Sequence, residues 1–212
     1  METLAKLFGS MAKVKIMKLF LFNPDQVFGN IEISERTKTN TTILRKELNL
    51  LEKIKFIKKK SFFKKIESDS NSKKVASSAT RRKGGKRISG WVINKDFEFL
   101  MPLQNLLIEN GSLGENEIID KLKKVGNLKL VIIAGVFIQD LNSRADILIV
   151  GDNLSDSLLE KSIHTLESEV GKELRYVVFE TADFKYRLGI YDKLLRDVLD
   201  YSHKKIVNKL DL

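Results

Sequence analysis

The sequence predicts an α+β protein of two parts: a basic helical module with a β-hairpin, and then a small α/β domain. The first part follows helical spacing and ends in two short strands, whereas the second alternates buried strands with amphipathic helices. The charge is divided in the same way. Residues 1–100 contain 23 Lys and Arg against 10 Asp and Glu, while residues 101–212 contain 15 against 18. We expect a module over residues 1–95, a helical connector over residues 96–127 and a second domain over residues 128–212.

The composition is that of an ordinary globular protein, with 42% hydrophobic and 31% charged residues. No apolar run reaches the roughly 18 residues that a membrane-spanning helix needs. The chain contains no cysteine, which excludes disulfides and thiolate metal sites and agrees with a reducing compartment. We therefore expect a cytoplasmic protein with no membrane partner.

The N-terminal module begins with two predicted helices. Residues 11–22 have apolar side chains at the i, i+3, i+4 spacing of one helix face. Asn-Pro-Asp at residues 23–25 ends this helix, because proline disfavours helical geometry in the residue before it. The segment IEISERTKTN, residues 31–40, predicts a short second helix with Ile31 and Ile33 as its apolar positions.

Residues 40–53 form the clearest helix of the sequence. Three leucines at i, i+4, i+7 spacing make its apolar stripe, and Asn40 or Thr39 is suited to cap its N-terminus. The other face combines short hydrogen-bonding side chains with cations, which suits base edges and phosphates in the major groove of DNA. The candidate DNA-binding residues of this helix are Asn40, Thr41, Thr42, Arg45, Lys46 and Asn49.

Two predicted strands follow, joined by a long basic segment. One lies within FIKKKSFFKKIE, residues 56–67, and the other runs from Arg87 to Asn94. Between Lys55 and Gly90 there are 13 Lys and Arg against two acidic residues. Such a hairpin suits contact with phosphates, and a solvated linker is the alternative. The candidate phosphate-binding residues are Lys58, Lys59, Lys60, Lys64, Lys65, Arg81, Arg82, Lys83, Lys86 and Arg87.

The three-helix order, the polar third helix and the basic hairpin over Thr3–Trp91 resemble the winged helix-turn-helix domains of prokaryotic transcription regulators, broadly of the ArsR and MarR type. The resemblance implies that residues 40–53 are the recognition helix and that residues 55–90 are the wing. It also implies double-stranded DNA as the partner and a homodimer as the binding form, since the operators of such domains are usually two-fold. The wing is longer and more basic than usual, which suggests additional phosphate contacts that do not depend on base sequence.

The connector carries a strongly apolar helix. DFEFLMPLQNLLIEN, residues 96–110, has its apolar residues in helical register, and Pro102 fits only near the first turn. This helix is expected to pack either between two protomers or against the C-terminal domain of its own chain. A second helix is expected over residues 114–126, ending at Gly126.

The C-terminal domain alternates strands and helices. Residues 128–135 and 145–151 predict two buried strands, and residues 173–180 predict a third. SDSLLEKSIHTLESEVG, residues 155–171, predicts an amphipathic helix, and the chain beyond Thr181 is expected to be mostly helical. The two histidines, His164 and His203, fall on predicted helices and are expected to be surface or satisfied side chains.

Residues 128–210 resemble the minimal nucleotidyltransferase domains of the DNA polymerase β superfamily. Those domains have a Gly-Ser turn that approaches a triphosphate, and an Asp-x-Asp strand whose carboxylates hold divalent cations. In this chain the pattern falls on Gly135, Val136, Arg144 and Asp146. Only the glycine and the second aspartate are kept, since the valine has no hydroxyl and the arginine repels a metal ion.

These replacements predict a domain without catalysis, without a bound metal and without a cofactor. The third carboxylate of the family falls near Arg175 and Tyr176, neither of which supplies one. A single carboxylate cannot support two-metal transfer. Asp146 is expected instead to pair with Arg144 or to cap the strand end.

Three functional hypotheses remain. The first is a sequence-specific DNA-binding transcription regulator whose inactive nucleotidyltransferase-like domain serves dimerisation, sensing of a small molecule or nucleotide, or partner docking. The second is an active or nucleotide-sensing nucleotidyltransferase. The third is an RNA-binding or antitoxin-like interaction protein that uses the basic hairpin on structured RNA. The division of charge and the order of helices and hairpin favour the first.

Overall fold

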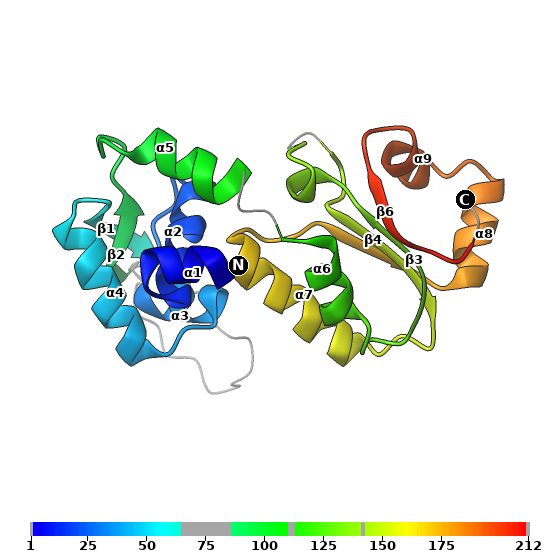
Figure 1. The fold of residues 1–212 in the computed structure, drawn as a ribbon, viewed down its shortest axis with the longest axis horizontal. Helices are drawn as coiled ribbons and strands as arrows, with labels where there is room; N and C mark the ends of the chain where they lie inside the picture. Colours follow the sequence, from blue (N-terminus) through cyan, green and yellow to red (C-terminus); the bar gives the residue numbers. More distant parts are fainter. Residues whose placement is uncertain (1, 65–85, 110–112, 141–142, 211–212) are drawn as a thin grey trace, which may run out of the picture.

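The computed structural model describes residues 2–64, 86–109, 113–140 and 143–210, with the backbone alone for residues 62–64, 86–88 and 109. Two halves lie next to each other along the long axis of the molecule (Figure 1). The described residues form a two-stranded sheet in the N-terminal half and a four-stranded sheet in the C-terminal half, both accompanied by helices. The predicted mixed α+β class is confirmed at this level.

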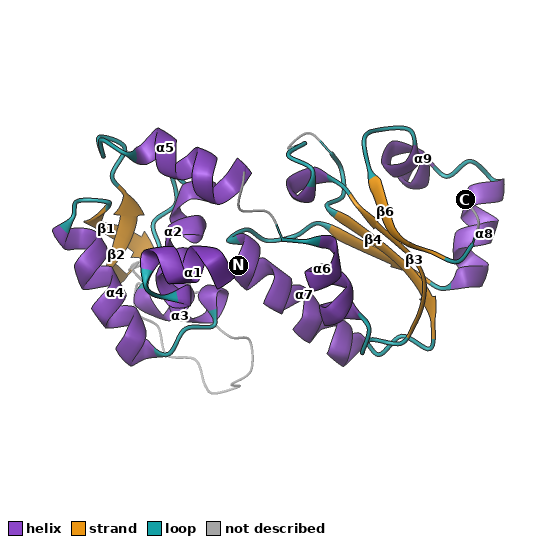
Figure 2. Ribbon diagram, in the orientation of Figure 1, coloured by secondary structure: helices purple, strands orange, loops and turns teal. Residues whose placement is uncertain are grey.

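The N-terminal half packs helices around one core and adds a hairpin (Figure 2). Its elements are α1 (Glu2–Phe8), α2 (Met11–Phe22), α3 (Asn30–Thr37), α4 (Thr41–Lys53), β1 (Ile57–Lys64) and β2 (Lys86–Ile93). The two strands pair antiparallel in continuous register, and Phe28 forms an isolated antiparallel bridge to Trp91 at the base of the hairpin. Leu44, Leu48 and Leu51 are each 1% exposed, so the predicted apolar stripe of α4 is confirmed.

Local signals in this half are also confirmed. α2 ends at Phe22, directly before the Asn-Pro-Asp sequence. Asn40 is the N-cap of α4, because its Oδ1 accepts a hydrogen bond from the Thr42 amide at 2.8 Å. One expectation for α3 is wrong: Ile33 is buried, but Ile31 is 76% exposed, since the helix begins at Asn30 and turns Ile31 toward solvent.

The apolar helix of the connector packs in a way that neither expected alternative included. α5 (Leu100–Gln104) continues into a π-helical segment, η1 (Asn105–Glu109), whose Leu107 is fully buried in the N-terminal core. Pro102 lies in the first turn of α5, where its missing N–H breaks no helical hydrogen bond. The helix leaves Phe99 and Met101 exposed, at 56% and 64%.

The C-terminal half is a sheet between two helical layers. Its elements are α6 (Glu115–Leu122), β3 (Asn127–Ile133), η2 (Gly135–Phe137), β4 (Ile147–Asp152), α7 (Asp156–Val170), β5 (Tyr176–Phe179), α8 (Thr181–Gly189), α9 (Lys193–Leu199) and β6 (Lys204–Asn208). The strand order is β5-β4-β3-β6, with β4 and β5 parallel and the other neighbours antiparallel. α6 and α7 cover one face of the sheet, and α8 and α9 cover the other.

The chain beyond Thr181 is mostly helical, as expected, but Lys204–Asn208 forms β6 and pairs with β3 at the sheet edge. One expectation for this half is wrong: the helix before β3 ends at Leu122 rather than at Gly126. Gly126 is instead a position where the backbone passes close to Asn153, because a Cβ there would lie 2.6 Å from the Asn153 carbonyl oxygen.

Helix α7 joins the two halves, packing against α2 and α3 as well as α6. We call this contact the α7 junction. Arg36 of α3 pairs with Glu173 at 2.6 Å, and Asn23 Nδ2 donates to the carbonyl oxygen of Gly171 at 3.2 Å. Gly171, the C-cap of α7 with φ +90°, lies so close to α2 that a Cβ would be 2.7 Å from the carbonyl carbon of Lys18.

Candidate functional site

The outer face of α4 is the first candidate site. The side chains of Arg45, Lys46 and Asn49 are exposed and make no hydrogen bond or ion pair with any residue that the structure describes. Thr41 and Thr42 are exposed at the start of the helix, next to the Asn40 cap. Because the leucine stripe holds the opposite side in the core, these polar side chains project from a firmly packed helix.

The hairpin carries the predicted basic residues, and two of them already have partners. Lys59 Nζ lies 4.9 Å from the Trp91 ring centroid and 3.0 Å from the Glu52 carboxylate. Lys58 Nζ donates to Asn94 Oδ1 at 3.2 Å, and Lys58, Lys59 and Lys60 are all exposed. Lys64, Lys86 and Arg87 lie on the paired strands. Lys65, Arg81, Arg82 and Lys83 lie outside the described residues.

The strand-turn-strand segment holds Asp146 in a closed set of contacts. Its side chain is fully buried, and Oδ1 accepts from the Val136 amide at 3.0 Å. Arg175 supplies the other donors: its backbone amide and Nε lie 2.9 and 3.1 Å from Oδ2, and its Nη2 lies 3.2 Å from Oδ1. Each carboxylate oxygen therefore has two protein donors.

These donors fix the charge of Asp146. Burial by itself would raise the pKa of the carboxyl, but hydrogen bonds from Arg175 and Val136 outweigh it and lower the pKa below its ordinary value. Gly135 belongs to the same contact, because its φ is +52° and a Cβ there would collide with the Asp146 carboxylate. The glycine that resembles a phosphate-binding turn is thus required by Asp146.

The remaining motif residue, Arg144, is turned away from Asp146. The Arg144 side chain is 63% exposed, and its Nε lies 2.9 Å from Oδ2 of Asp197 in α9. The expected pairing of Asp146 with Arg144 is therefore wrong, because β5 runs beside β4 and brings Arg175 next to the carboxylate. Within the described ranges, no group of three or more His, Asp or Glu could hold a metal ion.

The two histidines lie in separate places. His164 is exposed on α7, with Nδ1 2.9 Å from Glu167, as expected for a satisfied surface residue. His203 is not on a helix: it precedes β6, and its Nδ1 lies 2.9 Å from the carbonyl oxygen of Tyr201.

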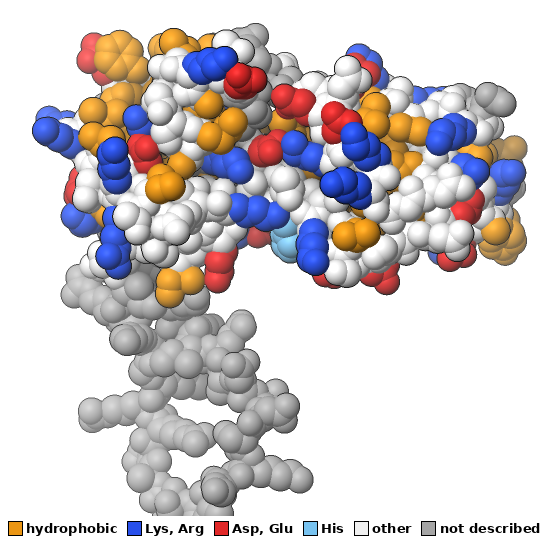
Figure 3. Space-filling model, turned by 60° about the horizontal axis from the view of Figure 1, so that its bottom comes forward, with side chains coloured by type: hydrophobic (Ala, Val, Ile, Leu, Met, Phe, Trp, Pro, Cys, Tyr) orange, Lys and Arg blue, Asp and Glu red, His pale blue; other side chains and the backbone are white. Residues whose placement is uncertain are grey.

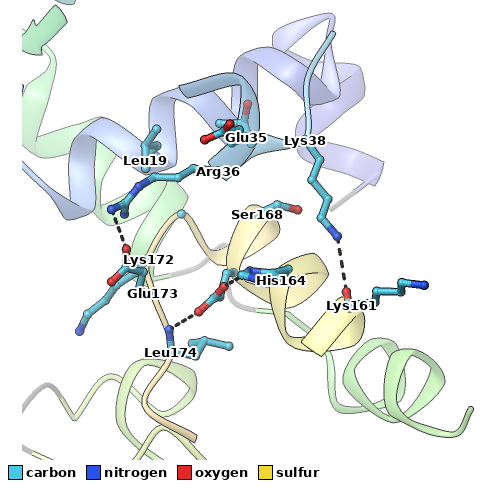
Figure 4. A pocket seen from close by; sticks show the side chains of 13 residues that line it. Leu19, Glu35, Arg36, Lys38, Lys161, His164, Ser168, Lys172, Glu173 and Leu174 are labelled. Carbon is cyan, nitrogen blue, oxygen red and sulfur yellow. Dashed lines mark hydrogen bonds and ion pairs between the residues drawn. The ribbon is translucent and has the colours of Figure 1, made fainter. Parts of the chain in front are cut away.

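A pocket at the α7 junction was not predicted from the sequence (Figure 4). The cavity of about 650 Å³ lies between the C-terminal end of α3 and the C-terminal part of α7. Arg36 and Lys38 line it from the N-terminal half, His164 and Ser168 line it from α7, and Leu19 of α2 contributes an apolar wall. Only the folded chain brings these segments together, so no local sequence signal points to the pocket.

Two lysines of α2, Lys15 and Lys18, lie on the other side of the junction. Lys18 is 2% exposed, and burial lowers its pKa to about 8 although the Glu169 carboxylate opposes the shift. Burial likewise lowers the pKa of Lys15, where Glu169 opposes and the positive charge of Lys38 adds to the lowering. The junction therefore contains two lysines whose ammonium groups are partly removed from water.

Among the helices that the structure describes, none combines the length and the apolar character needed to cross a membrane. The features that bear on function are the polar face of α4, the contacts of Asp146 and the pocket at the α7 junction. Comparison of the chain with protein-family models, with curated proteins and with solved structures gives no match.

Proposed function

We propose that the protein is a sequence-specific transcription regulator that binds double-stranded DNA through a winged helix-turn-helix in its N-terminal half. The observation that carries this proposal is the polar face of α4. Arg45, Lys46 and Asn49 have donors and acceptors that are free among the described residues. An α-helix fits the major groove of DNA, where arginine and asparagine side chains form bidentate hydrogen bonds with guanine and adenine.

The elements around α4 support the same proposal. α2, α3 and α4 precede an antiparallel hairpin, and the Phe28–Trp91 bridge joins the base of the hairpin to the segment before α3. Ile43 and Leu50, 47% and 41% exposed, flank the polar face. Such side chains suit contact with thymine methyl groups, and sequence reasoning missed them. On the face seen in Figure 3, Lys and Arg side chains occur over both halves with Asp and Glu among them, and the excess of Lys and Arg in residues 1–100 suits a polyanion bound by the N-terminal half.

We also propose that the C-terminal half is a catalytically inactive nucleotidyltransferase-like domain used for dimerisation, sensing or docking. The order of β3, the glycine turn and β4 supports the resemblance. The loss of activity is supported by Asp146, whose oxygens are fully engaged by Arg175 and Val136. Two-metal transfer needs several carboxylates free to bind cations at one place.

Binding-site selection from random double-stranded DNA, followed by anisotropy titrations at increasing salt, tests the DNA proposal. A two-fold consensus and an affinity that falls steeply with salt are expected. Arg45→Ala should weaken binding to the selected site about 10- to 100-fold, the cost of one bidentate base contact. Lys185→Ala removes the same charge from an exposed position on α8 and serves as the control, with little change expected.

Absence of DNA binding at low salt, or unchanged affinity of Arg45→Ala, would overturn the proposal. Tighter binding of duplex RNA than of DNA with the same sequence would instead favour an RNA-binding protein.

A further inference from the structure

We propose that the pocket at the α7 junction binds a nucleoside monophosphate, and that its occupancy changes the DNA affinity of α4. The cavity of about 650 Å³ lies in the range of pockets that hold small molecules. The binding site itself is independent of the DNA proposal, whereas the effect on α4 rests on it.

The pocket lining has cationic charge without an anionic partner. Lys38 Nζ donates to the Thr165 hydroxyl at 2.8 Å and to the Lys161 carbonyl oxygen at 3.4 Å, and neither acceptor is charged. Lys161 and Lys172 also line the cavity, and their ammonium groups have no ion pair with any described residue. Glu35 is the lining carboxylate that remains unpaired among those residues. Counted over the whole lining, four cations (Arg36, Lys38, Lys161 and Lys172) face three carboxylates (Glu35, Glu167 and Glu173), so an anionic group would neutralise an excess of one positive charge.

Arg36 adds a cation that a ligand can recruit. In Figure 4, Arg36 and Lys38 lie on either side of His164, one toward each end of the pocket. Arg36 pairs with Glu173, whose side chain is 72% exposed. Arg36 itself is 26% exposed, and it also pairs with Glu32 at 3.4 Å and lies over the Phe28 ring. Because Glu173 is largely exposed, its pair with Arg36 contributes only about 0–1 kcal/mol, so a doubly charged phosphate can replace that carboxylate while the other contacts hold the guanidinium in place.

The apolar part of the lining argues for more than a phosphate ion. Leu19 and Leu174 line the cavity and are 2% and 6% exposed. Gly171, where no Cβ would fit, also lines the cavity. The two leucines are already buried, so the apolar wall open to a ligand comes mainly from the aliphatic stems of the lining lysines, against which the flat base of a nucleotide can pack.

The position of the lysine links the pocket to α4. Lys38 is the C-cap of α3 with φ 50°, and it lies two residues before Asn40, the N-cap of α4. A ligand held by Lys38 and by α7 therefore fixes the turn that sets the start of α4. Such a ligand changes DNA affinity to the extent that it prefers one arrangement of the junction.

Calorimetric titration of the full chain with AMP, GMP, CMP and UMP, and with inorganic phosphate, tests the site. At least one nucleotide should bind with a dissociation constant below about 1 mM, at least about tenfold more tightly than inorganic phosphate. Lys38→Glu and the milder Lys38→Gln should each weaken that binding at least about tenfold, with circular dichroism showing that both variants fold. Lys185→Glu, the control of equal charge change, should bind as the wild type does.

The site is overturned if none of the four nucleotides binds, if inorganic phosphate binds equally well, or if both folded Lys38 variants bind normally.

With saturating nucleotide, the affinity for the selected DNA site should change by at least about fivefold. Nucleotide binding with no change in DNA affinity overturns the coupling. Nucleotide binding by a protein that binds no DNA would reject the DNA proposal and leave the site, whereas DNA binding without nucleotide binding would reject the site alone.

Discussion

At the residue scale, the four donors around Asp146 make a stability prediction. Asp146→Asn would place an amide N–H against donors, leaving backbone and guanidinium N–H groups without an acceptor. We expect the free energy of unfolding to fall by about 2–3 kcal/mol, because water can still reach the Arg175 guanidinium, which is 45% exposed. Arg144→Gln, which breaks a surface pair, should cost less than about 1 kcal/mol. Denaturant unfolding followed by circular dichroism measures both.

The pH dependence of the same variant checks the cause. The folded pKa of Asp146 lies below its ordinary value of 3.8, so its stabilisation is complete well above 3.8. It is lost as the pH falls through the folded pKa. The wild type should therefore lose more stability on acidification than Asp146→Asn does, and equal losses would contradict a buried ionised carboxylate.

At the element scale, Asn40 has a capping role that can be separated from any contact with DNA. Asn40→Ala should lower the free energy of unfolding by about 1 kcal/mol, because the Thr42 amide loses its acceptor. Asn40→Ser, which keeps a side-chain oxygen for the cap, should leave stability nearly unchanged. Urea unfolding measures the difference, and an equal loss for both variants would contradict the capping role. A drop in DNA affinity for Asn40→Ser at full stability would assign the amide to base contact.

Elements with a strong local pattern were predictable, and elements fixed by distant contacts were not. The leucine stripe and the cap define α4 within the helix itself. β6 is only five residues long, and it pairs with β3, which lies more than 70 residues earlier in the chain. Its lysine-rich sequence follows a helix without an obvious break, so the local pattern did not indicate a strand. The partner of Asp146 was missed for the same reason, since Arg175 is 29 residues away and reaches it only through the pairing of β4 with β5.

At the scale of the whole molecule, the α7 junction decides whether the two halves unfold together. Arg36 with Glu173 and Asn23 with Gly171 connect segments about 140 residues apart in sequence, which no local pattern indicates. The charge division and the change of pattern at Leu128 predicted two parts, but α7 contributes to the C-terminal core while packing on α2 and α3. The proposed effect of the pocket on α4 depends on this contact.

Gly171→Ala tests that coupling, and Gly9→Ala is its matched control. Both glycines have positive φ, +90° and +78°, but a Cβ at Gly171 would meet α2 backbone atoms at 2.7–2.8 Å, whereas nothing lies within 4 Å at Gly9. Gly9→Ala should therefore show the conformational cost alone, about 1–2 kcal/mol. Gly171→Ala should lose about 1–3 kcal/mol more, because overpacking separates α7 from α2.

The separation should be visible as a loss of cooperativity on heating. Trp91 is the single tryptophan and lies in the N-terminal half, so its fluorescence reports that half, while far-UV circular dichroism reports both. The wild type and Gly9→Ala should give coincident transitions by the two probes, whereas Gly171→Ala should give transitions that no longer coincide. Coincident transitions in Gly171→Ala at unchanged stability would mean that the close approach at residue 171 does not hold the halves together.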